Sequence, residues 1–142
     1  MNVIDANLLI YSYNSGSDYH RQAALWLENA LSSDDVVGFT WQAISAFLRV
    51  MTNPKLPVRR FSLVQAAQIV DVWLEHPNIH VLTPGERYWP LFRRMVVEGR
   101  AAGPLVSDAQ IAALTIEYGG VLYTADRDFA RFPGLRWKNP LD

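Results

Sequence analysis

Three aspartates stand at the ends of predicted secondary structure elements, where carboxylates can act together. Asp5 directly follows a short apolar segment at residues 2–4. Asp126 comes just after a second apolar segment at residues 121–124, and Asp108 lies in the first turn of a predicted helix. In open α/β sheets, ligands bind beyond the carboxyl ends of the strands, where the strand order reverses. If the two strands are neighbours, Asp5 and Asp126 lie side by side and Asp108 points into the same cleft.

Carboxylates this close together repel one another in a cleft of low dielectric, so such a site needs shared protons or a cation. Hard oxygen donors with no His or Cys beside them favour Mg²⁺ or Mn²⁺. Such an ion stabilises charge on a phosphate and generates hydroxide from a bound water. The pattern therefore predicts a metal site that hydrolyses phosphodiesters, with Asp5, Asp108 and Asp126 as metal ligands.

Each aspartate also has a simpler explanation. Asp108 could favour a helix N-terminus through the helix dipole, and Asp126 and Asp128 could be turn residues. Asp5 is harder to explain in this way. It stands between an apolar strand and the apolar residues 8–11, so it should lie near the core, where a carboxylate is costly unless it is paired or metal-bound. The coincidence of three aspartates at three element ends favours the functional interpretation.

Three further residues are candidates for binding the substrate or positioning the aspartates. Asn7 either orients Asp5 or caps the first helix. Thr124 either forms a hydrogen bond with a metal ligand or has only a structural role in its strand. Arg49, on the helix after the second strand, pairs with an aspartate, binds a phosphate or is an ordinary surface arginine.

Two basic groups are candidates for contacts with RNA. Lys55, Arg59 and Arg60 share one loop, and Arg93 and Arg94 are adjacent on a later helix. The simpler explanation for both groups is a solvated charged face.

The elements that must position these residues alternate between strand-like and helix-like segments, which indicates an α/β fold around a mainly parallel sheet. We expect strands at residues 2–4, 36–40, 79–82, 121–124 and, at an edge, 135–137. We expect helices at residues 19–31 and 41–52, from residue 62 to Pro77, in the region after residue 82 and at 108–118, with a turn or short helix at 126–132.

Local signals predict several helix ends. Ser62 and Gln65 fit a capping box. Ser107 is a good N-cap for the helix at 108–118, and Gly119 is suited to close it.

The start of the helix after residue 82 has two interpretations. Thr83, Pro84 and Glu86 fit the N-cap, N1 and N3 positions. Pro90 conflicts with that start, because a proline inside a helix removes a hydrogen bond and clashes with the preceding turn. The helix therefore either kinks at Pro90 or begins near Trp89.

Composition limits the class of protein. The 142 residues are 50% hydrophobic, contain no cysteine and carry a formal net charge of −1. This length suits a single domain over residues 1–142 with a sizeable core. The absence of cysteine is compatible with a reducing cytoplasm, and we expect a cytoplasmic protein without a signal peptide or membrane span. The net charge weakens binding to nucleic acid by bulk charge alone, but it does not exclude a nuclease.

The segments VIDANLLIY, SDAQIAAL and TADRDFARF resemble, in the same order, the motif blocks of PIN domains of the VapC toxin type. The resemblance runs over essentially the whole chain, including FLRVMTNP and PGLRWKNPL. It implies a three-layer α/β/α sandwich with a central, mainly parallel sheet of four to five strands. It also implies a metal-dependent endoribonuclease toxin that forms homodimers and is neutralised by a small cognate antitoxin of the VapB type.

On this resemblance, Asp5, Asp108 and Asp126 match the acidic metal-site positions of the family, and Asp128 matches an additional acid in the last block. The chain departs from the pattern at one place. Many PIN domains carry a glutamate just before the F-L-R-like run, where this chain has Ala46. Compensation by Asp128, tight binding of only one metal ion and loss of activity all remain open.

Two alternatives compete with a nuclease. The first is a degenerate PIN domain that binds RNA or a protein without cutting. The second is a phosphatase of the haloacid-dehalogenase type. Asn7 disfavours it, because that chemistry usually needs a second aspartate at this place, and the only lysines, Lys55 and Lys138, lie in no convincing motif.

Trp41, Trp73 and Trp89 either line a groove for the antitoxin or belong to the core. The sequence does not distinguish tRNA, rRNA and mRNA as the RNA substrate.

Overall fold

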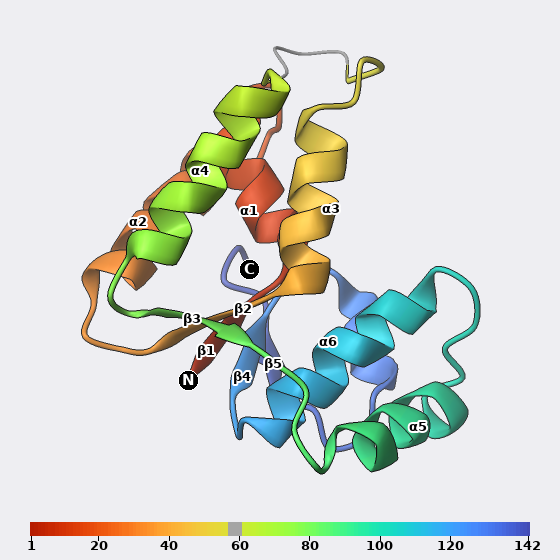
Figure 1. Cartoon of the computed structure of the whole chain (residues 1–142). Coiled ribbons are helices and arrows are strands. Elements are labelled where there is room, and N and C mark those ends of the chain that lie inside the picture. The colour runs from red at the N-terminus through yellow and green to blue at the C-terminus, as the bar shows by residue number, and fades with distance from the viewer. Residues whose placement is uncertain (57–60) are drawn as a thin grey trace.

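A computed structural model describes residues 1–56 and 61–142 of the chain, and its sheet has five parallel strands in the order β3-β2-β1-β4-β5 (Figure 1). The strands are β1 (Asn2–Ile4), β2 (Val37–Thr40), β3 (Ile79–Leu82), β4 (Val121–Tyr123) and β5 (Trp137–Lys138). The helices are α1 (Ala6–Tyr13), α2 (His20–Ser32), α3 (Trp41–Met51), α4 (Leu63–Glu75), α5 (Tyr88–Glu98) and α6 (Leu105–Glu117), with a short 3-10 helix η1 (Arg127–Arg131). The predicted α/β fold is confirmed.

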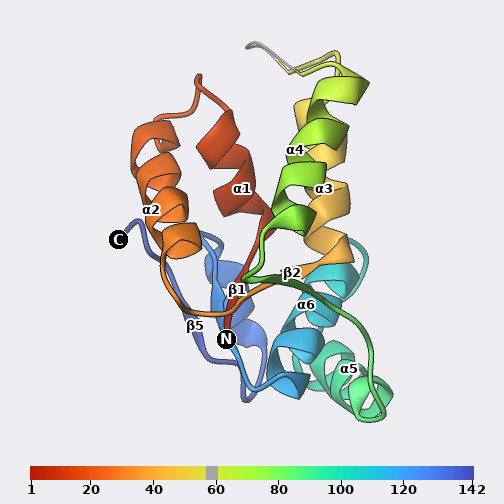
Figure 2. The same ribbon diagram turned by 60° about the vertical axis from the view of Figure 1, so that its left-hand side comes forward.

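The helices form two layers, one on each face of the sheet. Helices α1 to α4 cover one face, and α5 and α6 cover the other (Figure 2). Strand β1 shows why both faces of the sheet are covered. Successive side chains of a strand point to opposite faces. Val3 packs in the core beside α5 and α6, whereas Ile4 packs in the core beside α1 to α4. Both side chains are fully buried, so the sheet is covered on both sides and the predicted α/β/α sandwich is confirmed.

The strand order reverses at β1, which pairs in parallel with both β2 and β4. From β1 the sheet continues through β2 to β3 on one side and through β4 to β5 on the other. Ile4 lies opposite Tyr123, and the backbone amide of Asp5 donates to the Tyr123 carbonyl at 3.0 Å. The segments that follow β1 and β4 therefore leave the sheet side by side, at the point where ligands bind in sheets of this kind.

Two predicted helix ends are confirmed. Ser62 Oγ accepts from the Gln65 amide at 3.1 Å, and Gln65 Oε1 accepts from the Ser62 amide at 3.0 Å, which makes the expected capping box of α4. At the end of α6, Gly119 has φ +67° and the Gly120 amide donates to the Thr115 carbonyl at 2.9 Å. A glycine is favoured at this left-handed position because it has no Cβ.

The predicted N-cap of α6 is wrong. The helix begins at Leu105 with Pro104 as its N-cap, so Ser107 lies inside the first turn and caps nothing. The backbone turns earlier than expected, because the Leu105 amide already donates to the Ala102 carbonyl at 3.2 Å. Asp108 stays in the first turn, as predicted.

The predicted N-cap of α5 is also wrong. The helix begins at Tyr88, so Thr83, Pro84 and Glu86 lie before it, and the alternative start near Trp89 is confirmed to within one residue. Pro90 then falls in the first turn, where no backbone N–H has an intrahelical acceptor and a proline removes no hydrogen bond.

The end of α6 holds the turn that precedes α5, and α5 itself has no side-chain cap among the described residues. The Glu117 carboxylate accepts from the Gly85 amide at 2.8 Å and from the Arg87 amide at 3.0 Å. A local sequence pattern cannot predict these contacts, because the acceptor lies about thirty residues away.

Smaller differences concern strand ends and one tryptophan. Strand β4 ends at Tyr123, one residue before Thr124, and the edge strand β5 lies at Trp137–Lys138 instead of residues 135–137. Trp73 is 2% exposed and packs on several rings of the α1–α4 layer, so it belongs to the core and lines no partner groove. Within the described ranges, no helix has the length and apolar character needed to cross a membrane.

Candidate active site

Asp5 lies at the junction of β1 and α1, where it is the N-cap of that helix. Its Oδ1 accepts from the Ala6 amide at 2.8 Å, and its Oδ2 accepts from the Thr124 hydroxyl at 2.8 Å. The side chain is only 6% exposed. This burial raises the pKa of Asp5 from 3.8 to about 6, against the two hydrogen bonds, and the charge of Asp126 raises it further. Asp5 is thus a buried carboxylate held in a fixed orientation.

Thr124 links the ends of β1 and β4. Besides donating to Asp5, its hydroxyl oxygen accepts from the Asp126 amide at 3.0 Å and from Asn7 Nδ2 at 3.2 Å. Thr124 is fully buried. The side chain therefore fixes the position of one aspartate directly and of a second through its backbone.

Asn7 joins α1 to the segment after β4. Its Oδ1 accepts from the Ala125 amide at 3.2 Å, while its Nδ2 donates to Thr124. Asn7 does not cap α1, because Asp5 occupies that position. Asn7 reaches Asp5 only through Thr124, so any influence on the carboxylate is indirect.

Asp108 faces the other aspartates from α6. Burial raises its pKa from 3.8 to about 6, and the charges of Asp5, Asp126 and Asp128 raise it as well. Only Arg131 opposes this shift. The four carboxylates predicted from the sequence therefore share one electrostatic environment, in which ionisation of Asp108 costs more than in water and a bound cation would offset that cost.

Asp126 and Asp128 lie on the turn into η1. Asp126 is the N-cap of η1, and its Oδ1 accepts from the Asp128 amide at 2.9 Å. Asp126 is half-buried and Asp128 is exposed. Asp126 therefore acts as a turn residue, as one interpretation of the sequence predicted, and it also lies close enough to Asp5 to raise the pKa of that carboxyl.

The donors offered to a metal ion are carboxylate oxygens. Across residues 1–56 and 61–142, no three Asp, Glu, His or Cys side chains are grouped so that they could hold one ion together. Mg²⁺ is usually bound through one or two carboxylates and keeps several of its waters. The residues present therefore fit a hydrated Mg²⁺ or Mn²⁺, and they do not fit a cage made entirely of protein ligands.

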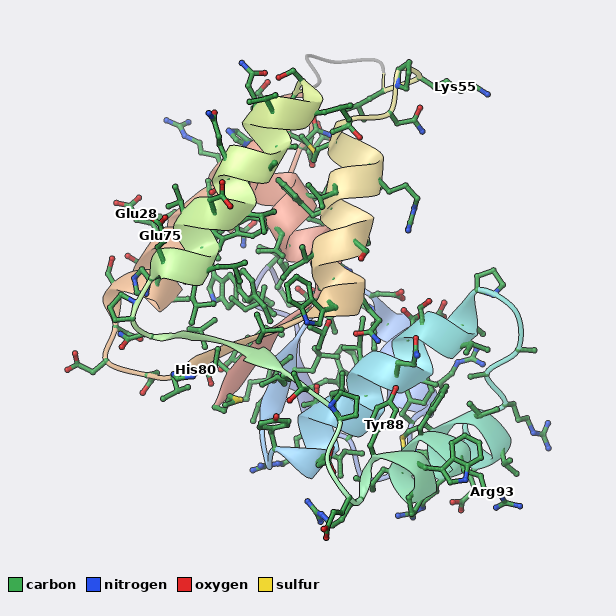
Figure 3. All side chains as sticks on the ribbon, in the orientation of Figure 1. Glu28, Lys55, Glu75, His80, Tyr88 and Arg93 are labelled. Carbon is green, nitrogen blue, oxygen red and sulfur yellow. The ribbon has the colours of Figure 1, made fainter. Side chains whose placement is uncertain are left out.

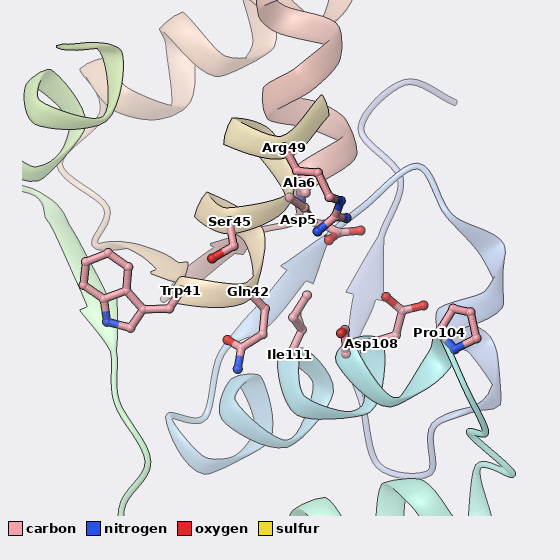
Figure 4. Close-up of a pocket in the computed structure, with 11 residues that line it drawn as sticks. Asp5, Ala6, Trp41, Gln42, Ser45, Arg49, Pro104, Asp108 and Ile111 are labelled. Atoms are coloured by element: carbon pink, nitrogen blue, oxygen red, sulfur yellow. Dashed lines mark hydrogen bonds between the residues drawn. The ribbon is translucent and has the colours of Figure 1, made fainter. Parts of the chain in front are cut away.

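A pocket of about 490 Å³ opens between α3 and α6 beside Asp5 and Asp108 (Figure 4). Helix α3 begins directly after β2, where Thr40 Oγ1 accepts from the Ala43 amide at 3.1 Å, so its first turns lie at the same sheet edge as Asp5. The side chains that α3 places along the pocket are Trp41, Gln42, Ser45, Ala46 and Arg49. The pocket thus extends from the carboxylates along one face of α3.

Arg49 is exposed at this pocket and is free of ion pairs. Among the described residues, the only ion pair joins Arg94 and Glu98, at 2.7 Å. The sequence left open whether Arg49 pairs with an aspartate; no such pair is present. The Arg49 guanidinium therefore has its donors available to an anion that enters the pocket.

The other basic candidates do not form one surface. Lys55 and Arg49 border the same shallow hollow at the end of α3. Arg59 and Arg60 lie outside the described residues. Arg93 lies on α5, at the opposite end of the molecule from Lys55 (Figure 3).

Ala46 lines the same pocket as Asp5 and Asp108. A glutamate at this position would face the carboxylate cluster, so the departure from the family pattern concerns this site directly.

Sequence reasoning missed Gln42 and Arg131 as site residues. Gln42 precedes Ala46 by four residues and Arg49 by seven, and this spacing places all three on one face of α3. This helical spacing is the sequence signal from which Gln42 could have been predicted as a site residue. Arg131 has no such signal, because its closeness to Asp108 depends on the fold.

Comparisons with known proteins agree with this fold. Residues 3–135 match the PIN domain family. Ribonuclease VapC37 of Mycobacterium tuberculosis is 36% identical over 140 residues, which cover 99% of this chain and 97% of the relative. Ribonuclease VapC33 of the same species is 33% identical over 141 residues, 99% of each chain.

Solved structures with low sequence identity share the fold. VapBC-1 from nontypeable Haemophilus influenzae superposes with a TM-score of 0.71 at 17% identity, over 99% of this chain and 98% of that one. Mycobacterium tuberculosis VapC20, described as a Sarcin-Ricin loop cleaving toxin, gives a TM-score of 0.64 at 21% identity, over 96% of this chain and 99% of that one.

Proposed function

This chain belongs to the PIN-domain family, and on this premise we propose that it is a metal-dependent endoribonuclease toxin of the VapC type, which hydrolyses RNA phosphodiester bonds. The relatives VapC37 and VapC33, which both carry a ribonuclease name, are 36% and 33% identical over nearly the whole chain. The observation that carries the proposal is the pair Asp5 and Asp108, whose pKa values are both raised to about 6 at the edge of the sheet where the strand order reverses. Perturbed carboxylates at such a place are typical of catalytic sites.

Of Asp5, Asp108 and Asp126, one or two would bind Mg²⁺ or Mn²⁺ directly and the others through bound waters, and Asp128 would add a further negative charge. When bound, the ion stabilises charge on the scissile phosphate and lowers the pKa of a bound water. The 2.8 Å hydrogen bond from Thr124 orients Asp5 and favours its ionised form against the effect of burial. Asn7 holds Thr124 in place.

Arg49 would bind a phosphate oxygen of the RNA. It lines the pocket beside Asp5 and Asp108, and its guanidinium meets no carboxylate within the described residues. A guanidinium matches the geometry of a phosphate and keeps its charge at any physiological pH. Arg49 would therefore place the scissile phosphate against the carboxylates.

A cognate antitoxin of the VapB type and a second copy of the chain are the proposed protein partners, in the cytoplasm. The names of the structural neighbours support the antitoxin, since several are VapBC complexes. Of the tryptophans considered for such an interface, Trp41 and Trp89 are exposed and Trp73 is buried. Only the first two therefore remain available to a partner.

A second candidate is an RNA-binding PIN domain that does not cut. Ala46 favours it, because this residue lines the pocket where a fourth carboxylate would contribute to metal binding. The retained and electrostatically coupled aspartates favour catalysis instead.

Removal of the metal separates these two functions. Purified protein is incubated with a mixture of tRNA, rRNA and mRNA in Mg²⁺, in Mn²⁺ and in EDTA, and EDTA-treated protein is then supplied again with Mn²⁺. We expect cleavage only with metal, and its recovery when Mn²⁺ is restored. Binding of RNA without cleavage in any metal would support the non-catalytic alternative.

A further inference from the structure

We propose that Trp41 and Gln42 form a nucleobase subsite that receives the unpaired base next to the scissile phosphate. The subsite rests on the proposed ribonuclease function and specifies how its substrate is held. Both residues line the pocket that also contains Asp5 and Asp108. Trp41 lies at one end of this pocket and Asp108 at the other (Figure 4).

Trp41 presents an unused aromatic surface. It is the first residue of α3, its side chain is 50% exposed, and it has no ring partner among the described residues. Trp26 and Trp73 differ, since Trp26 packs on Tyr123 and Trp73 is enclosed by rings. An exposed indole at the rim of a polar pocket is suited to stack on an unpaired base, whatever its identity.

Gln42 holds an unsatisfied polar atom beside this surface. Its Oε1 is buried and has no hydrogen-bond partner within the described part of the chain. A buried acceptor without a donor is unfavourable in the free protein. Gln42 lines the pocket, so a rotation of its side chain toward a ligand there would let a donor on that ligand satisfy the oxygen. A glutamine amide both donates and accepts, which suits the edge of a nucleobase.

The spacing along α3 supports a nucleotide as the ligand. Gln42 and Arg49 are seven residues apart on the same helix face, which corresponds to about 10 Å along the axis. In RNA each base is joined to its phosphate through one sugar. A phosphate bound by Arg49 beside the carboxylates would therefore direct the neighbouring base along α3, toward Gln42 and Trp41. The charged groups in the pocket are the carboxylates of Asp5 and Asp108 and the guanidinium of Arg49, and of these the guanidinium is suited to bind a phosphate directly.

The test measures RNA binding with a protein that does not cut RNA, so that binding is separated from cleavage. Affinity for a short single-stranded RNA is measured with the Asp108→Asn protein, which binds RNA without cutting it on the proposed mechanism. Gln42→Met and Trp41→Ala are then introduced on this background. The control is Trp89→Ala, which removes a tryptophan that is also exposed but lies on α5, outside the pocket.

We expect Trp41→Ala and Gln42→Met each to weaken RNA binding by about 10-fold, and Trp89→Ala to leave it unchanged, since stacking on one aromatic side chain contributes a factor of this order. An RNA that lacks the base at the cleavage position should bind weakly to all four proteins alike. Gln42→Met should also unfold at the same or a higher temperature than its parent, because it removes an unsatisfied buried acceptor. A merely structural glutamine would not combine unchanged stability with weaker RNA binding.

Unchanged RNA affinity in both variants would overturn the subsite and leave the exposed indole to a protein partner. A loss of stability in Gln42→Met would also count against it. Failure of the subsite can be distinguished from failure of the proposed ribonuclease function. If no metal supports cleavage but the two variants still lose affinity, the catalytic proposal fails and the subsite stands. If the parent binds no RNA, both fail.

Discussion

The hydroxyl of Thr124 donates a 2.8 Å hydrogen bond to Oδ2 of Asp5 and so joins the end of β4 to the end of β1. Its oxygen also accepts from the Asp126 amide at 3.0 Å. The hydrogen bond to Asp5 lowers the pKa of this carboxylate against the effect of burial. Thr124 is therefore a positioning residue, which acts on the candidate metal site through two aspartates.

We predict that Thr124→Val lowers the free energy of unfolding by about 1–3 kcal/mol, because the buried Asp5 loses the donor at its Oδ2 and keeps only the Ala6 amide at Oδ1. The pKa of Asp5 should rise further, so the pH at which cleavage reaches half its maximum should shift upward. Urea unfolding and a pH–rate profile measure the two effects. Thr124→Ser keeps the hydroxyl and is the matched control; equal behaviour of the two variants would show that the hydrogen bond is unimportant.

Stability in the absence of metal should fall as the pH rises. Asp5 and Asp108 have pKa values of about 6 in the folded protein and ordinary values near 4 when unfolded. Between about pH 4 and pH 6 the folded state thus binds more protons than the unfolded state, and the free energy of unfolding decreases through this window. Urea unfolding in EDTA at about pH 5 and about pH 7.5 tests the sign. Asp5→Asn removes the contribution of Asp5 and should flatten the dependence.

Divalent ions should reverse this trend. A cation binds the ionised carboxylates, so Mn²⁺ should raise the unfolding temperature more at about pH 7.5 than at about pH 5. Asp34→Asn, which changes an exposed aspartate in the turn after α2, should respond to Mn²⁺ as the wild type does. An equal response of wild type and Asp5→Asn to Mn²⁺ would argue that the ion binds elsewhere.

Replacement of Arg49 should weaken catalysis without weakening the fold. Arg49→Met removes a charge-assisted contact to the substrate, so kcat/KM for RNA cleavage should fall by about 10- to 100-fold. Arg49→Lys should recover only part of the loss, because lysine cannot make the paired hydrogen bonds of a guanidinium. Arg21→Met on α2, which removes an exposed arginine away from the pocket, is the control. A similar loss in both methionine variants would point to a general effect of charge.

The capping box of α4 should affect stability alone. Ser62→Ala removes the acceptor of the Gln65 amide and should lower the free energy of unfolding by about 1 kcal/mol. RNA cleavage should be unchanged, because α4 does not line the pocket. Ser15→Ala at an exposed loop position should alter neither quantity, and a loss of cleavage in Ser62→Ala would indicate that α4 influences the site.

The sequence predicted those parts of the fold that depend on local pattern or on strand order. The apolar strands end at Asp5 and just before Asp126, and their parallel pairing brings these aspartates together. The capping box at Ser62 is local as well, since both of its hydrogen bonds lie within four residues.

The wrong predictions of helix starts have two physical causes. One is the backbone turn that precedes the helix, and the other is a contact with a residue that is distant in sequence. Ser107 is a good N-cap by type, but the turn before Leu105 starts α6 earlier. Thr83 does not cap α5, because Glu117 at the end of α6 holds residues 85–87 in a turn and the helix begins only at Tyr88. The unsatisfied oxygen of Gln42 could not be predicted either, since it depends on how closely α3 packs against its neighbours.

The central claim is that the aspartate cluster of this PIN domain cuts RNA, and the most direct test is the cleavage rate of Asp108→Asn beside Asp34→Asn in Mn²⁺, with both proteins shown to be folded. Asp108 lies in the pocket among the other carboxylates, whereas Asp34 is an exposed turn residue. The account predicts wild-type cleavage by Asp34→Asn and none above background by Asp108→Asn. Cleavage by Asp108→Asn at the wild-type rate would contradict it.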